Sequence, residues 1–172
     1  MKRAKGSDKT ETAEKLENLL TEEIDALQTA VEKAEKVREY IFSHDWKSLT
    51  EGIKEMDNSS EGVNTLERRR EKVFKELCES VGLEKNAGFY SVVVRLHPKT
   101  RDRLSSLFRT LKTEVLQLQG ITWSIDAYVQ SMSGTIKEIL YTAFPHRRGT
   151  MYEKSGKQRS VESDPLVVNR QL

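Results

Sequence analysis

The chain has 172 residues, of which 36% are hydrophobic and 33% are charged, and its formal net charge is +2. This length is typical of one domain, and the lean hydrophobic fraction excludes a thick core. Basic residues are in excess at both ends of the chain, but no aromatic residues are interleaved with them as in a nucleic-acid stacking surface. We therefore expect long amphipathic helices and no nucleic-acid partner.

Three absences concern the location of the protein. No run of about 18 apolar residues is present, so we expect no direct membrane insertion. The basic N-terminus is not followed by the apolar stretch of a secretory signal. The single cysteine, Cys78, excludes an internal disulfide and suits a reducing compartment. Together these features predict a cytoplasmic location.

Two long helices are predicted in the first half, after a disordered basic tail at residues 1–9. The first covers residues 11–43, because apolar residues recur there at intervals of three and four. Ser43 or Asp45 can cap a second helix over residues 46–82, and Gly82 stands where a glycine ends a helix. Residues 57–62 are poor helix formers, so two alternatives remain for this stretch: a continuous helix, or a helix with a bulge or short loop.

The segment Phe89–Leu96 is apolar and β-branched, but no second strand is expected to pair with it. A short helical turn or a packed extended segment is therefore preferred. A third long helix is predicted over residues 100–144, capped by Thr100 and ended before Pro145, with a flexible tail at residues 145–172. The predicted fold is all-α: an elongated antiparallel bundle, or coiled-coil hairpin, of three long helices.

The third helix carries the longest apolar stripe, and we expect the rest of the chain to be organised around it. Its positions keep a repeat of 3.5 residues, which holds one helix face against a partner helix. All but Thr122 are apolar. The positions are Leu104, Phe108, Leu111, Val115, Leu118, Thr122, Ile125, Val129, Met132, Ile136, Ile139 and Ala143.

The C-terminal half of this helix is more apolar than one seam requires. Six further residues lie off the stripe there: Ile121, Trp123, Tyr128, Leu140, Tyr141 and Phe144. Two interpretations stay open. The additional face packs on Phe89–Leu96 or on the first helix, or it accepts an amphipathic helix from another protein.

No catalytic or metal-binding pattern is found, so neither an enzyme nor a cofactor is predicted. Cys78 lies beside Glu79 near a helix end, where its pKa is expected to rise, and it is interpreted as a small apolar residue of the core. The three histidines are far apart in sequence. Arg68, Arg69 and Arg70 face different directions on one helix turn and are expected to pair with neighbouring glutamates.

The layout resembles the FlgN family, the flagellar export chaperones for hook-filament junction proteins. The resemblance covers residues 14–158 and includes the leucine-rich and glutamate-rich opening helix, the turn with Asp45, the arginine-containing stretch that ends at Gly82, and the long third helix. Its sharpest part is Tyr152 followed by Gly156, similar to the family's tyrosine, three residues, glycine signature after the last helix. The chain departs from the family in lacking asparagine in the middle of that helix.

The resemblance implies a cytoplasmic binder, without catalysis, of the C-terminal helices of hook-filament junction proteins. It would prevent their premature assembly and deliver them to the export gate, acting as a monomer or weak dimer. Tyr152 and Gly156 would dock on the cytoplasmic domain of the export-gate membrane protein. The client would contact Ile125, Tyr128, Val129, Met132, Ile136, Ile139, Leu140 and Phe144.

A second hypothesis comes from a different class of protein. The same apolar stripe would let the chain associate with itself as a structural coiled-coil adaptor or scaffold. The sequence alone leaves both hypotheses standing.

Overall fold

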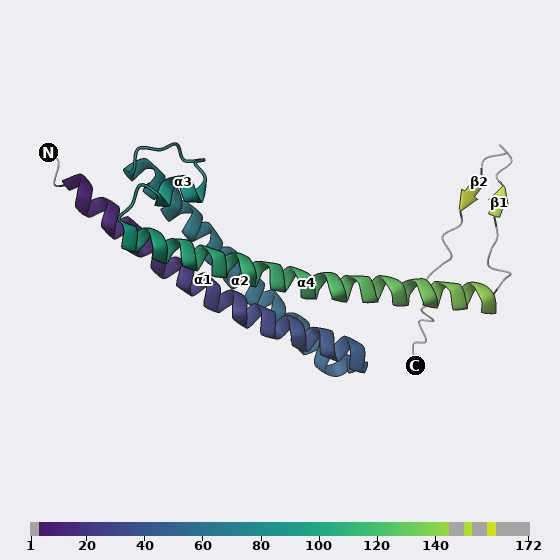
Figure 1. Ribbon diagram of the computed structural model, residues 1–172. Helices are drawn as coiled ribbons and strands as arrows, with labels where there is room; N and C mark the ends of the chain where they lie inside the picture. Colours follow the sequence, from purple (N-terminus) through teal and green to yellow (C-terminus); the bar gives the residue numbers. More distant parts are fainter. Residues whose placement is uncertain (1–3, 145–149, 153–157, 161–172) are drawn as a thin grey trace. The chain divides into compact units, whose positions relative to one another are not determined.

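The structure, a computed structural model, describes residues 4–144, 150–152 and 158–160. The fold is all-α, as predicted, with long helices packed on one another and one short pair of strands (Figure 1). The chain divides into two compact units, Met1–Ile125 and Asp126–Leu172. Helix α4 contributes residues to both units. The elements are α1 (Ala4–Ser43), α2 (Trp46–Ser80), α3 (Phe89–Val93), α4 (Pro98–Ala143), β1 (Thr150–Tyr152) and β2 (Gln158–Ser160).

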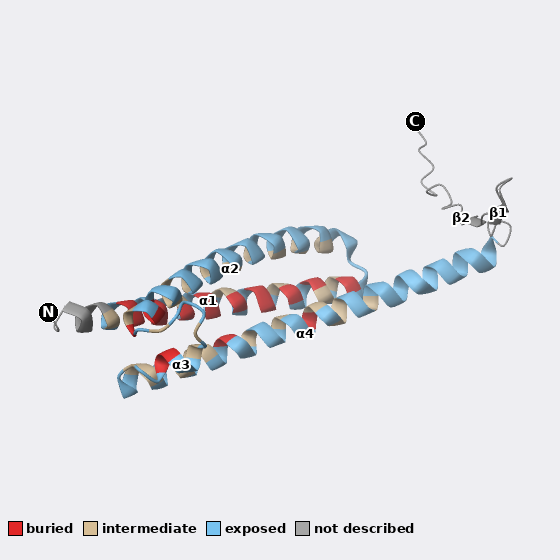
Figure 2. Ribbon diagram, turned by 90° about the horizontal axis from the view of Figure 1, so that it is seen from above, coloured by how far each residue is buried: buried red, intermediate tan, exposed pale blue. Residues whose placement is uncertain are grey.

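In the first unit the core follows α1, which lies between α2 and the first part of α4 (Figure 2). The buried residues of α4 are Leu104 and Leu111, which are a small part of its stripe, and Ile121, which lies off the stripe. The expectation that the third helix is the organising element is therefore wrong, because the middle helix is buried from two sides. Ten core residues belong to α1: Ala13, Leu16, Leu20, Ile24, Leu27, Ala30, Val31, Ala34, Val37 and Ile41.

Polar contacts at the edges of the core show the direction in which the helices run. Arg103 Nε lies 3.1 Å from Glu17 Oε2, and Gln28 Nε2 donates to Glu114 Oε1 at 3.0 Å. Both α1 and α4 therefore advance the same way along the core, while α2 returns in the opposite direction (Figure 1). This up-down-up order confirms the predicted bundle.

The turn between α1 and α2 consists of two residues. His44 takes a left-handed conformation with φ of 60°, and the Asp45 N–H donates to the Tyr40 carbonyl at 3.0 Å. Asp45 then caps α2, since its carboxylate accepts from the Ser48 N–H at 3.1 Å. The hydrogen bonds from Ser48 lower the pKa of Asp45 below its usual value. Of the two residues suggested as the cap, Asp45 is the one used.

Residues 57–62 do not interrupt α2, which is continuous to Ser80. Lys33 of α1 crosses to this stretch, where its Nζ donates to Ser59 Oγ at 2.7 Å and to the Glu55 carbonyl at 3.3 Å. Gly82 ends the helix as predicted: its φ is 76°, and the next N–H, of Leu83, donates to the Cys78 carbonyl at 2.9 Å.

The segment after α2 forms the short helix α3, one of the two preferred interpretations of Phe89–Leu96. Phe89 stacks on Phe108 of α4, with ring centroids 3.9 Å apart, and on Phe74 of α2, with centroids 5.8 Å apart. Two valines of α3, Val92 and Val93, are fully buried. The aromatic stack thus ties three helices together at the start of α4.

The helix bounds differ from the predictions mainly at the two ends of the chain. The first helix begins at Ala4, so residues 4–9, which were predicted to be disordered, are helical, and residues 1–3 lie outside the described residues. The third long helix begins at Pro98, because a proline fits the first turn of a helix, where its missing N–H is not needed. The strands β1 and β2 pair antiparallel, with Tyr152 opposite Gln158, and were not predicted. The rest of the predicted flexible tail, residues 145–172, lies outside the described residues.

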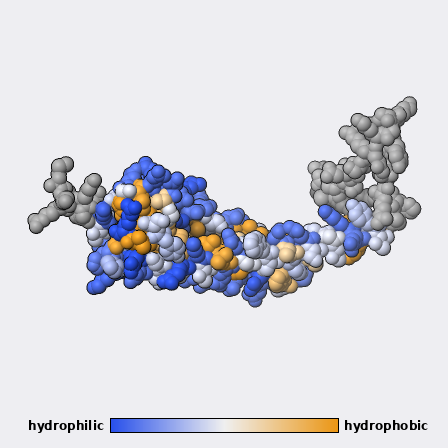
Figure 3. Space-filling view, turned by 45° about the horizontal axis from the view of Figure 1, so that its top comes forward, coloured by the Kyte–Doolittle hydropathy of each residue, from blue (hydrophilic) through white to orange (hydrophobic). Residues whose placement is uncertain are grey.

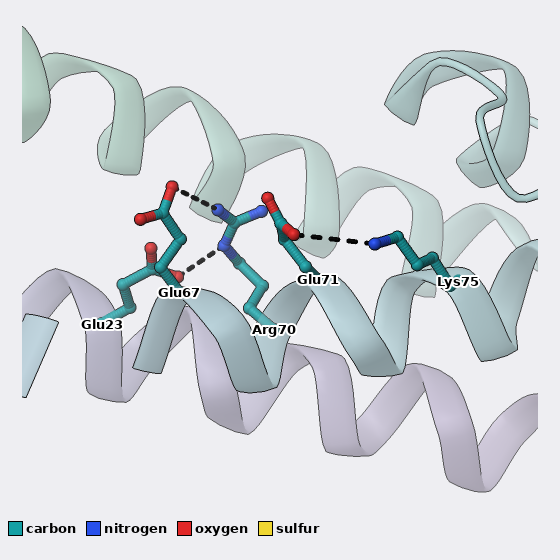
Figure 4. A network of polar contacts seen from close by, with 5 residues as sticks. All are labelled: Glu23, Glu67, Arg70, Glu71 and Lys75. Atoms are coloured by element: carbon teal, nitrogen blue, oxygen red, sulfur yellow. Dashed lines mark hydrogen bonds and ion pairs between the residues drawn. The ribbon is translucent and has the colours of Figure 1, made fainter. Parts of the chain in front are cut away.

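A buried ion pair crosses from α1 to α2 (Figure 4). Arg70 Nε donates to Glu23 Oε2 at 2.5 Å, and the two side chains are 18% and 5% exposed. Burial raises the pKa of Glu23, while Arg70 acts in the opposite direction. Arg70 also lies 4.0 Å from Glu67, one of the neighbours expected to pair with the arginines. The pair favours this alignment of α1 and α2, because a slip would leave Glu23 buried without a cation.

We predict that Arg70→Ala destabilises the protein by about 3 kcal/mol at neutral pH, because Glu23 would remain buried without a cation. A raised pKa in the folded state favours folding below the pKa of the unfolded chain, and this benefit is lost as the pH rises through the folded value. The loss in Arg70→Ala should therefore shrink as the pH falls towards about 5. Urea unfolding at both pH values measures the difference in the free energy of unfolding between the variant and the wild type.

The matched control is Arg70→Ala combined with Glu23→Gln, which has no buried charge to protonate. Its stability relative to the wild type should change less between the two pH values. An Arg70→Ala variant as stable as the wild type at neutral pH would contradict a structural role for the pair.

Two glycine substitutions should have opposite signs. Gly62 lies inside α2 with open space at its Cβ position, so Gly62→Ala should stabilise the protein by about 0.5–1 kcal/mol. Gly82 also has open space but a positive φ, so Gly82→Ala should destabilise it by about 1 kcal/mol. Urea unfolding compares the two. A loss of stability in Gly62→Ala would show that α2 is strained at this point.

Candidate protein-binding surface

The residues considered above as catalytic or metal-binding candidates have structural roles. Cys78 is completely buried, and burial raises its pKa, with a smaller contribution from Glu79. The predicted direction is confirmed, although its main cause is burial. Within the described residues, no group of three or more histidine, cysteine, aspartate or glutamate side chains could hold a metal ion. None of the described helices is long and apolar enough to cross a membrane.

Large apolar side chains are exposed on the part of α4 that belongs to the second unit. From Val129 to Ala143 every residue of α4 is exposed (Figure 2). We call five of them the terminal stripe; none belongs to the core of the described residues. They are Val129 (46% exposed), Met132 (38%), Ile136 (52%), Ile139 (61%) and Leu140 (38%).

The other predicted client-binding residues differ in exposure. Phe144, directly after α4, is about half exposed. Tyr128 is partly buried. Ile125 is also partly buried, and it packs against the small core cluster of Val31, Ala34 and Ile121 in the first unit. Ile125 therefore belongs to the folding core and is less available to a partner than the terminal stripe.

The terminal stripe lies on one face of its helix. Each residue of an α-helix advances by about 100°, so the five side chains fall within an arc of about 100°. Leu111, Leu118 and Ile121, which pack in the core, fall on the same side when counted along α4. The terminal stripe thus continues the face that α4 already uses to pack against a helix.

The rest of this helix surface is largely polar but carries few charged side chains. Among residues 126–143 the charged side chains are Asp126, Lys137 and Glu138, and Gln130 donates to Asp126 at 2.7 Å. Serine, threonine and glycine fill most of the remaining positions. Charges at the edges of a helix seam select partners by repulsion, and this surface has few of them.

One of the two interpretations left open by the sequence holds for one residue of the additional face. Ile121 is buried and packs with Val31 and Ala34 of α1. Leu140 is exposed. Two aromatic residues on the opposite face, Trp123 and Tyr141, are exposed as well. Hydrophobic residues also reach the surface elsewhere, on the face shown in Figure 3.

A second exposed apolar group was missed. Phe42, Trp46 and Ile53 lie near the α1–α2 turn and are each about half exposed or more. Trp46 and Ile53 are apolar residues of α2, but helical periodicity does not show how far along α2 the neighbouring helices cover such residues. The weak apolar density at residues 57–62 was the available signal that this end of α2 is thinly covered.

The predicted docking residues lie beyond α4. Tyr152 is the last residue of β1, where its backbone pairs with Gln158. Gly156 lies outside the described residues.

No protein-family model, no curated protein and no solved structure matches this chain.

Proposed function

We propose that this protein is a cytoplasmic export chaperone of the flagellar type III pathway. It would bind the C-terminal helices of hook-filament junction proteins, prevent their premature assembly and deliver them to the export gate. The observation that carries the proposal is the terminal stripe, an exposed apolar face on a long helix. The identity of the clients comes from the resemblance to the FlgN family.

The shape of the stripe favours a helical client. Its residues lie at helical spacing, and an amphipathic helix presents apolar anchors at the same spacing. The preceding part of the same face packs against α1, so α4 already accepts a helix in this register. A client helix at the terminal stripe would repeat that packing with a second protein.

Such an interaction also suits a carrier that must release its client. Only five large side chains form the stripe, which makes the buried area small compared with a permanent complex. A client segment that folds on binding would spend part of the interaction energy on ordering. Moderate affinity and ready release would follow.

We predict that Met132→Asp combined with Ile136→Asp abolishes capture of the hook-filament junction protein of the same cell. Two carboxylates would be placed in the centre of the apolar contact, where their desolvation is unfavourable. Helicity should stay close to that of the wild type, because both side chains are exposed. Co-purification measures capture and circular dichroism measures helicity.

The control is Gln130→Asp combined with Ser131→Asp, which adds the same charge to one neighbouring turn of the helix, away from the stripe. This control should capture the client as the wild type does. Unchanged capture by the Met132 and Ile136 variant would place the client site elsewhere. Dimers that do not depend on concentration and persist with client present would favour the structural adaptor instead.

A separate prediction concerns delivery. Tyr152→Ala should leave client capture unchanged but lower export of the junction protein, because the tyrosine would contact the export gate after the client is bound. Secretion of the junction protein into the medium is the measurement, with Tyr152→Phe as the conservative comparison. Secretion at the wild-type level in Tyr152→Ala would remove the docking role.

A further inference from the structure

Four of the five residues of the terminal stripe have the same spacing when they are counted from either end. Val129, Met132, Ile136 and Ile139 are separated by three, four and three residues. A second copy of the helix, placed antiparallel, therefore meets this stripe with an identical set of positions. We propose that two copies of the protein pair through their terminal stripes, antiparallel, with Met132 opposite Ile136 and Val129 opposite Ile139.

Residue size selects this register. The four layers pair only valine, methionine and isoleucine, and Leu140 lies at the edge of the same seam. In a register shifted towards the start of α4, Ile125 would have to join the seam between the two copies. Ile125 is already packed in the first unit. In a register shifted towards the end of α4, the small Ala143 would take the place of Val129 in the seam. The proposed register therefore covers the most apolar surface that is free to be covered.

Charge does not oppose the pairing. In this register Lys137 lies level with Ser131 of the second copy, and Glu138 lies level with Gln130. A parallel arrangement would place each charged residue level with its own counterpart and would align the two helix dipoles. The antiparallel arrangement avoids both effects.

The second copy is also favoured by continuity with packing inside one chain. The face of α4 that carries the stripe packs against a helix for the first part of its length. The residues from Val129 to Ile139 extend it by about 15 Å. This length is short for a standard interface of about 800 Å² per partner, so the dimer should be weak and dependent on concentration.

The pairing uses the surface assigned to the client, but it is measured on the protein alone. Loss of one activity therefore does not imply loss of the other. A client would compete with the second copy, and that competition is the only part that rests on the proposed function.

Disulfide trapping tests the arrangement in the full chain. Met132→Cys and Ile136→Cys proteins, one of them carrying a tag, are mixed under mild oxidation. Cys78 stays in place, because it is fully buried, and the unmodified chain is the blank. The mixed disulfide should form several times faster than either protein forms one with itself. A Gln130→Cys protein, modified away from the stripe, should not be trapped.

Sedimentation velocity of the unmodified chain supplies the second measurement. The dimer fraction should rise with concentration in the wild type and in Gln130→Asp with Ser131→Asp, and vanish in Met132→Asp with Ile136→Asp. Faster self-trapping of Met132→Cys would overturn the antiparallel arrangement. A monomer at every concentration, without mixed disulfide, would overturn the proposal.

Discussion

The apolar face of α1 is the constraint on which the first unit depends. Residues from Ala13 to Ile41 on this face are buried along its length, and α2, α3 and the first part of α4 each contribute side chains to the same core. No other described helix is buried so extensively. A polar residue in the middle of this face would therefore weaken the packing of several elements at once, whereas the same change near the end of α4 would meet water.

The helical period predicted the fold well but not its centre. Periodicity shows which residues of a helix share a face, and it gave three long helices and the position of Gly82. It does not show which helix lies between the other two, and the longest stripe belongs to α4 while α1 is the buried helix. Residues 57–62 stay helical because each poor helix former costs at most about 1 kcal/mol, and Lys33 gives them a contact across the bundle.

The candidate surface was only partly accessible to prediction. The excess of apolar residues after Ile121 can be read from the sequence, but whether another element covers them depends on tertiary packing. Exposure separates Ile125, which packs in the first unit, from Met132 and Ile136, which do not. The strands β1 and β2 were missed because three polar or mixed residues each provide no measurable alternation.

The two-residue turn at His44 and Asp45 has a consequence for the order in which the chain can fold. It brings α1 and α2 together with little loop to close, so most early contacts are between residues near in sequence. Both helices of this hairpin are complete at Ser80, so a ribosome would release them before α4 has been made. The other side of α1 would then stay exposed until the first half of α4 emerges. The first half of α4 would meet an already folded helix to pack against, and its second half would not.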